Sequence, residues 1–251
     1  MRIVPLSEGA FTIDQTKEFI PFDKSADELQ ERTRGSLLVE IQPFLVITQN
    51  DILLLDTGLG FTDEKGIMQI HQNLANNGIN PTDITKVLMT HLHKDHAGGM
   101  VYFDRSEKKY KAAFPRATYY INRKEWDYAL GNIGPSYDMA KIQTLLDTGQ
   151  VSFIENDLGQ IDDYLHYELS AGHSPCHQVF FIKENDQIVF FGGDEAPQLQ
   201  QMKTRYVAKY DNDGKRAMAL RQQWWEQAQQ EGWTILFYHD IKQPTFHFPL
   251  H

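Results

Sequence analysis

Apolar segments typical of β-strands end, one after another, at a histidine or an aspartate. The segment TKVLMT runs directly into His91, and the segments YLHYELS, QIVFF and TILFY are followed within three residues by His173, Asp194 and His239. A further run, ILLL, ends at Asp56. Short apolar runs of this kind indicate buried strands. We therefore expect sheets whose strand ends deliver imidazole and carboxylate groups to one site.

The densest of these strand ends is the stretch HLHKDHAGG. His91, His93 and Asp95 are spaced by two, so an extended chain can project them to one side, while the adjacent His96 can turn toward a different point. This arrangement suits two neighbouring metal ions better than one. Nitrogen and oxygen donors without a thiolate fit zinc and also iron, manganese or cobalt. The two glycines that close the stretch are expected to let the backbone turn tightly.

The rest of the chain is rich in strand signals, with helices between groups of strands. The first sixty residues contain the runs SLLVEIQPFLVIT and DILLLDTG, and ENDQ indicates a tight hairpin turn. Residues 63–78 are typical of a helix with Ile67 on its apolar face, and a longer helix is expected over 214–231, closed by Gly232. Buried sheets with helices outside are the architecture that this order favours.

Length, charge and composition narrow the class of protein. A chain of 251 residues with 41% hydrophobic residues is compatible with one domain, and we expect a single domain over 1–251. A net charge of −10 disfavours nucleic acid as a partner and leaves a small-molecule substrate as the expected one.

Sequence patterns also bear on the expected location of the protein. The printed sequence has no long apolar window for a membrane and no signal-peptide pattern, and its single cysteine, Cys176, permits no internal disulfide. We expect no membrane partner and a cytoplasmic location. No feature of the sequence fixes an oligomeric state.

The ordered set of motifs resembles a known family. HLHKDH, GHS, GGD and HD, preceded by LLLDTG, resemble the metallo-β-lactamase superfamily over residues 37–245. The resemblance implies an α+β fold, a four-layer αββα sandwich with two metal ions at one edge of its sheets. It also implies a role for each motif residue: the first metal is held by His91, His93 and His173, the second by Asp95, His96 and His239, with Asp194 bridging both and Asp56 orienting a ligand or the motif loop.

One letter of the first motif favours hydrolysis. Diiron reductases of the superfamily have glutamate where this chain has His93. The resemblance implies two divalent ions, zinc first among them, whose bridging hydroxide attacks the carbonyl of a lactone, ester, thioester or amide. Asp95 is the expected catalytic residue, ligating the second metal and passing a proton to the leaving group.

Within the hydrolytic branch, the motifs are most similar to N-acyl-homoserine-lactone lactonases. This chain departs from them in having Cys176 in place of a glycine and Pro197 in place of a tyrosine that contacts the substrate. Tyr206 and Tyr238 are the candidates to replace that tyrosine. We expect Cys176 to be a small packing residue.

Three other functions remain as alternatives. A single iron held by His91, His93, His173 and Asp194 would resemble the persulfide dioxygenases, which are oxidoreductases on the same fold. A phosphotriesterase-type hydrolase would use the same two metals on a phosphorus centre. A non-catalytic metal-binding module would keep the fold without turnover.

Overall fold

Two six-stranded β-sheets form the middle of the molecule in the computed structural model, which describes residues 1–249. The first sheet consists, in spatial order, of β1 (Arg2–Pro5), β5 (Phe44–Ile47), β6 (Ile52–Leu55), β7 (Lys86–Leu88), β10 (Thr118–Asn122) and β11 (Val151–Ile154). The second consists of β12 (Leu158–Ile161), β13 (Leu165–Leu169), β14 (Gln178–Glu184), β15 (Gln187–Phe191), β16 (Thr234–Leu236) and β17 (Thr245–His247).

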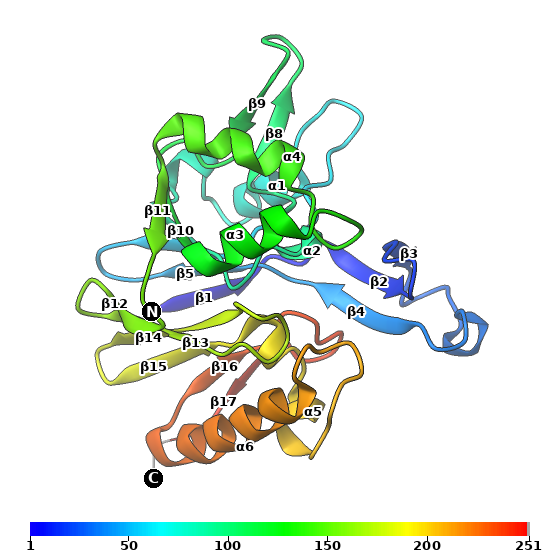
Figure 1. The fold of residues 1–251 in the computed structure, drawn as a ribbon, viewed down its shortest axis with the longest axis vertical. Helices are drawn as coiled ribbons and strands as arrows, with labels where there is room; N and C mark the ends of the chain where they lie inside the picture. The colour runs from blue at the N-terminus through cyan, green and yellow to red at the C-terminus, as the bar shows by residue number, and fades with distance from the viewer. Residues whose placement is uncertain (250–251) are drawn as a thin grey trace.

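Helices cover the outer face of each sheet (Figure 1). Those over the first sheet are α1 (Gln69–Ala75), α3 (Arg123–Gly131) and α4 (Met139–Ile142), and those over the second are α5 (Leu199–Lys203) and α6 (Gly214–Glu231). The remaining helical segments are short: α2 (Lys94–Ala97), η1 (Leu29–Glu31), η2 (Pro81–Asp83), η3 (Gln143–Thr148) and η4 (Gly193–Glu195).

Alternating side chains divide the apolar core into three layers. Leu53 and Leu55 of β6 point inward and pack with Phe180 of β14 between the sheets. Leu54, between them in sequence, points outward to the helices over the first sheet. Trp224 of α6 packs on the outer face of the second sheet. Successive strand residues face opposite sides, so the layer order is helix, sheet, sheet, helix, as predicted.

The expected first strand is two strands in different sheets. The run SLLVEIQPFLVIT is interrupted at Gln42 and Pro43, because proline has no N–H for a sheet ladder. Before the break, β4 (Leu37–Ile41) joins β2 (Gly9–Ile13) and β3 (Ile20–Phe22) in a three-stranded sheet. After it, the chain enters the large sheet as β5. The hairpin of β8 (Val101–Asp104) and β9 (Lys109–Ala112) forms a further small sheet.

The predicted helix over 63–78 begins only at Gln69, so the first part of that prediction was wrong. The Asp63 carboxylate accepts hydrogen bonds from the backbone N–H groups of Lys65 and Ile67, at 2.9 and 2.8 Å. An aspartate that bonds nearby backbone in this way favours a turn over a helix. Ile67 is consequently 46% exposed rather than on the apolar face.

Two local predictions are confirmed. The ENDQ turn joins β14 to β15, with Asn185 and Asp186 at φ values of 49° and 60°, the left-handed conformation that a two-residue hairpin loop needs. The long helix α6 spans the predicted residues, and Gly232 ends it at φ 70°.

Strand direction explains why distant residues meet. β13 and β15 both pair antiparallel with β14, and β16 pairs parallel with β15, so these three strands end at the same edge of the second sheet. In the first sheet, β6 and β7 are parallel and also end together. The segments after these five strands carry the histidines and aspartates singled out above.

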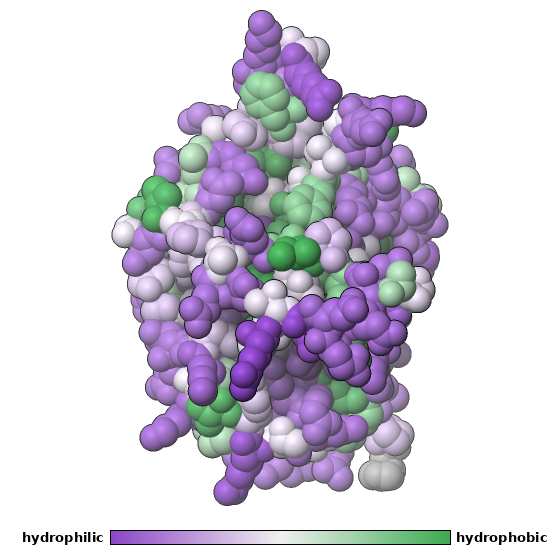
Figure 2. All heavy atoms as spheres, turned by 90° about the vertical axis from the view of Figure 1, so that its right-hand side faces the viewer, coloured by the Kyte–Doolittle hydropathy of each residue, from purple (hydrophilic) through white to green (hydrophobic). Residues whose placement is uncertain are grey.

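Hydrophilic side chains cover most of the molecular face shown in Figure 2, with apolar ones scattered among them. Within residues 1–249, none of the helices combines the length and the apolar character that a membrane crossing requires.

Candidate metal centre

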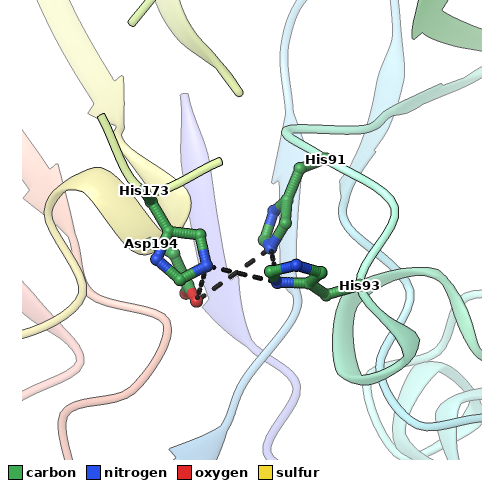
Figure 3. A group of neighbouring side chains, drawn as sticks. All are labelled: His91, His93, His173 and Asp194. Atoms are coloured by element: carbon green, nitrogen blue, oxygen red, sulfur yellow. Dashed lines mark hydrogen bonds and ion pairs between the residues drawn. The ribbon is translucent and has the colours of Figure 1, made fainter. Parts of the chain in front are cut away.

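The first group of converging side chains comes from both sheets. His91 and His93 lie in the loop after β7, His173 follows β13, and Asp194 lies in η4 after β15 (Figure 3). The Nε2 atom of His91 is 2.9 Å from Nδ1 of His93, which is 3.2 Å from Nε2 of His173. One atom from each of the four residues lies within 4.8 Å of all the others.

The second group lies beside the first. It contains Asp95 and His96, both in α2, and His239, in the segment that follows β16. The Asp95 Oδ2 atom is 3.7 Å from His96 Nε2 and 3.6 Å from His239 Nε2. The short helix α2, not an extended loop, turns Asp95 and His96 away from the preceding histidines.

Asp194 joins the two groups through its two oxygens. Its Oδ2 atom is 3.1 Å from His173 Nε2 in the first group. Its Oδ1 atom is 3.1 Å from His96 Nε2 and 3.0 Å from His239 Nε2 in the second. A carboxylate with one oxygen in each of two adjacent donor sets has the arrangement needed to bridge two cations.

The electrostatics of the site fit cations. Burial alone would raise the pKa of the Asp194 carboxyl, but the imidazoles of His239, His96 and His173 hold that pKa well below its usual range. Burial holds the pKa of His91 well below its usual range, so this imidazole is neutral and has a free lone pair. His96 Nε2 and Asp194 Oδ1 are buried and 3.1 Å apart, but neither atom makes a hydrogen bond of regular geometry to any described residue. Nitrogen and carboxylate donors in this arrangement suit divalent ions such as zinc.

Asp56 lies behind the second group and is completely buried. Its Oδ2 atom accepts hydrogen bonds from His96 Nδ1 and the Thr90 hydroxyl, and its Oδ1 atom accepts one from the Thr90 N–H, all at 2.8 Å. The Thr90 hydroxyl also lies 3.0 Å from Nδ1 of His91. Asp56 thereby holds both the His96 ring and the loop that carries His91, with the Nε2 atoms of the two rings turned to the site.

Several residues that hold the site carry no recognisable sequence signal. The Glu125 carboxylate, on α3, accepts a 3.0 Å hydrogen bond from the Leu92 N–H inside the first motif. The His239 Nδ1–H donates to the backbone carbonyl of Glu40, at 2.7 Å. Asp211 accepts from His173 Nδ1, at 3.0 Å. The Nε2 atom of His177 accepts the Asp194 N–H, at 3.2 Å.

The two glycines of the first motif serve a different purpose from the one predicted. Gly98 ends α2 at φ −58°, so it makes no special turn. A Cβ at Gly98 would lie 2.2 Å from the Leu59 carbonyl oxygen, and one at Gly99 would lie 2.1 Å from that of Thr57. The glycines are needed because the loop after β6 packs backbone against backbone on α2.

The structure shows the contacts of Tyr238, one candidate to replace the lactonase tyrosine, and of the two departures from the lactonase pattern, Pro197 and Cys176. Tyr238 is buried, stacks on the His96 ring at 4.0 Å between centroids, and donates its hydroxyl hydrogen to the Asp95 carbonyl at 2.6 Å. The Tyr238 hydroxyl is therefore used in a hydrogen bond within the protein. The Pro197 carbonyl accepts the His239 N–H at 3.0 Å. Burial raises the pKa of the Cys176 thiol to about 11, which keeps it protonated at neutral pH.

The chain belongs to the metallo-beta-lactamase superfamily, whose family model matches residues 40–239. The superfamily binds metals in dinuclear sites built from histidine and aspartate clusters such as the two described above.

The chain is also similar to individual hydrolases, in sequence or in fold. The N-acyl homoserine lactonase AttM of Azorhizobium caulinodans is 29% identical over 114 residues, which are 42% of this chain and 38% of that protein. The chain thus matches well under half the length of this curated relative. A probable metal-dependent hydrolase from Staphylococcus aureus has a TM-score of 0.74 at 23% identity, covering 98% of this chain and 91% of that one. AidC, a dizinc quorum-quenching lactonase, has a TM-score of 0.72 at 20% identity, covering 98% and 89%. These two structures share the fold.

Proposed function

We propose that this chain is a dinuclear metal-dependent hydrolase of a small carbonyl compound, and that a lactone is its substrate class. The observation that carries the proposal is the position of Asp194, with one oxygen in each of two complete donor groups. The similarity to AttM over 114 residues supports a lactone over an amide or an ester.

The ligand assignment follows the two groups. His91, His93 and His173 would hold one ion, and Asp95, His96 and His239 would hold the other, with Asp194 shared. Zinc is the metal that this donor set suits best, with iron, manganese or cobalt as the other candidates. Two bound divalent ions would lower the pKa of a water molecule toward neutrality and polarise a substrate carbonyl.

Exposure indicates which side chains meet the substrate. The side chains of His91 and His96 are completely buried, whereas Asp95 and Asp194 keep 13% and 10% of their side-chain surface in contact with solvent. His173 and His239 are exposed to a similar small degree, at 7% and 9% of their side-chain surface. We infer that the substrate reaches the site where these side chains are exposed, and that Asp95, the most exposed carboxylate of the site, passes the proton to the leaving group.

The single-iron alternative would leave the second group of side chains without a metal to bind. A persulfide dioxygenase-like enzyme would use only the first group and Asp194. Asp95, His96 and His239 nevertheless converge beside that group, and Asp56 orients His96 toward it. A complete second donor set favours two ions.

Metal analysis combined with a substrate panel tests the proposal. The purified full chain is expected to contain two metal ions and to hydrolyse at least one member of a panel of lactones, esters, thioesters, β-lactams and phosphotriesters, with loss of activity in a chelator. One iron per chain with oxygen consumption on a glutathione persulfide would replace the hydrolase by the oxidoreductase. Hydrolysis of a phosphotriester alone would show that the chain is a phosphotriesterase-type hydrolase. A metal-loaded chain that hydrolyses no member of the panel would favour a non-catalytic metal-binding module.

Asp95→Asn tests the catalytic role of this residue. Loss of the carboxylate removes the proton carrier, and general acid–base catalysis contributes about 10²- to 10⁴-fold, so kcat is expected to fall by that order. Metal content is measured alongside, because Asp95 is also a proposed ligand. Asp240→Asn, at a position outside both groups, serves as the control. Full activity of the Asp95 variant on the responsive substrate would show that another group moves the proton.

A further inference from the structure

Asp211 has one hydrogen-bond partner in the described structure, and that partner is His173. Its Oδ1 atom accepts the Nδ1–H of His173 at 3.0 Å, and its side chain is 1% exposed. No other hydrogen bond or ion pair reaches its carboxylate within residues 1–249, and Oδ2 is buried without a partner. Asp211 is not the cap of α6, because Asp213 fills that role by accepting the Arg216 N–H at 3.0 Å.

His173 is held by its backbone as well as by its ring. The Glu195 Oε1 atom accepts the N–H groups of Gly172 and His173, at 2.5 and 2.8 Å. The His173 carbonyl accepts the Asn212 N–H at 3.0 Å, directly after Asp211. The segment that carries Asp211 is thus fixed to the segment that carries His173.

A buried arginine secures the same segment from α6. Arg221 is 1% exposed, and its guanidinium donates to the carbonyls of Glu195 at 2.8 Å and Tyr206 at 2.6 Å. Burial lowers the pKa of Arg221, while the nearby carboxylates of Asp211 and Glu195 act in the opposite direction.

The four supported histidines differ in their acceptors. His91 and His239 direct their Nδ1 atoms to neutral oxygens, the Thr90 hydroxyl and the Glu40 carbonyl. His96 directs its Nδ1–H to a carboxylate, Asp56, and His173 directs its own to Asp211. Each donor group therefore contains one imidazole backed by a buried carboxylate. A carboxylate partner fixes the tautomer and makes the opposite nitrogen a stronger donor.

We propose that Asp211 is the positioning residue of the first metal, as Asp56 is for the second. The carboxylate keeps the proton of His173 on Nδ1 and directs the Nε2 lone pair toward His93 and Asp194. Arg221 holds the loop that brings Asp211 to this place. This inference rests on the proposed function, since it assumes that His173 is a ligand.

Cobalt titration of the metal-free full chain provides the test. Visible absorption of bound cobalt(II), combined with chelator competition, is expected to resolve two binding steps in the wild type. His173→Ala and His239→Ala identify which step belongs to which group. Asp211→Ala is expected to weaken the step lost in His173→Ala by about 10- to 100-fold, to shift its cobalt spectrum, and to leave the other step unchanged. Asp211→Asn, which keeps an acceptor oxygen without the charge, is expected to fall between Asp211→Ala and the wild type.

Asp213→Ala is the matched control, because it removes a carboxylate two residues away that contacts only the start of α6. It is expected to reduce stability without moving either cobalt step. Unchanged affinity and spectrum in a folded Asp211→Ala, or an equal effect in Asp213→Ala, would overturn the role of Asp211. Absence of any cobalt binding by the wild type would instead overturn the proposed function.

Discussion

At the scale of single residues, the candidate site depends as much on hydrogen-bond partners as on the seven converging side chains. The sequence predicts the seven because each of them follows an apolar run or lies in one dense motif. The partners could not be predicted. The acceptor for His239 is a backbone carbonyl, which leaves no trace in sequence, and Asp211 lies in a polar loop where Asp213 looks equivalent. Only the three-dimensional position distinguishes the two aspartates.

Glu8 is another residue whose role becomes apparent only in the structure. It is buried, its Oε2 atom accepts the Leu59 N–H at 2.7 Å, and Tyr238 is an ionisable neighbour. Burial raises the pKa of Glu8 from 4.5 to about 7, against the opposing effect of that hydrogen bond. The folded chain therefore keeps a proton that the unfolded chain releases near pH 4.5. Stability from this group is present below that pH and is lost as the pH rises toward 7.

Glu8→Gln is expected to remove this pH dependence. A glutamine stays neutral and can still accept the Leu59 N–H, so the variant should be more stable than the wild type at pH 8, by about 3 kcal/mol at most, and similar to it at pH 4.5. Urea unfolding at both pH values measures the difference, with Glu226→Gln on the exposed face of α6 as the control. Equal stability of variant and wild type at pH 8 would show that Glu8 is not a buried, protonated acid.

At the scale of elements, the loop after β6 and the short helix α2 form one tightly packed unit. The Thr57 N–H and hydroxyl both bond to the His96 carbonyl, at 2.7 and 2.8 Å, and the Gly99 N–H bonds to the Gly58 carbonyl at 3.2 Å. The strands and the long helix could be predicted because apolar runs and terminal glycines mark them. The packing of one loop on another could not, since it depends on backbone atoms that every residue shares.

Gly98→Ala tests this packing. The added Cβ would meet backbone atoms of Leu59, which cannot rotate away, so the free energy of unfolding is expected to fall by about 1–3 kcal/mol. The same substitution at Gly131 at the end of α3, where nothing lies within 4 Å of the new Cβ, should be neutral or stabilise by up to about 1 kcal/mol. Denaturant unfolding measures the free energy of unfolding of both variants. Equal changes in the two variants would contradict the close packing at Gly98.

At the scale of the whole molecule, the first and last strands of the described residues, β1 and β17, belong to the sandwich. β1 pairs with β5 in the first sheet, and β17 pairs with β16 in the second. The N-terminal amine also donates to the Gln187 side chain of the second sheet, at 3.0 Å. The proposed metal centre takes residues from both sheets. We therefore propose that the sandwich is one cooperative domain in which metal binding and folding are linked.

Thermal unfolding with and without metal tests that linkage. A single transition is expected in both states, and zinc at a hundredfold excess over its dissociation constant should stabilise the chain by about 2.7 kcal/mol per site. Calorimetry gives both the number of transitions and the shift. Two separate transitions would divide the sandwich into independent units, and an unchanged melting temperature would remove the link between metal and fold.

The position of Asp194 between two donor groups is tested most directly by anomalous X-ray scattering from crystals of the zinc-loaded full chain. Data collected on both sides of the zinc absorption edge locate each ion without assumptions about activity. Two peaks are expected, one among His91, His93 and His173 and the other among Asp95, His96 and His239, with the Asp194 carboxylate between them. A single peak confined to the first group, or none at either, would contradict the dinuclear centre.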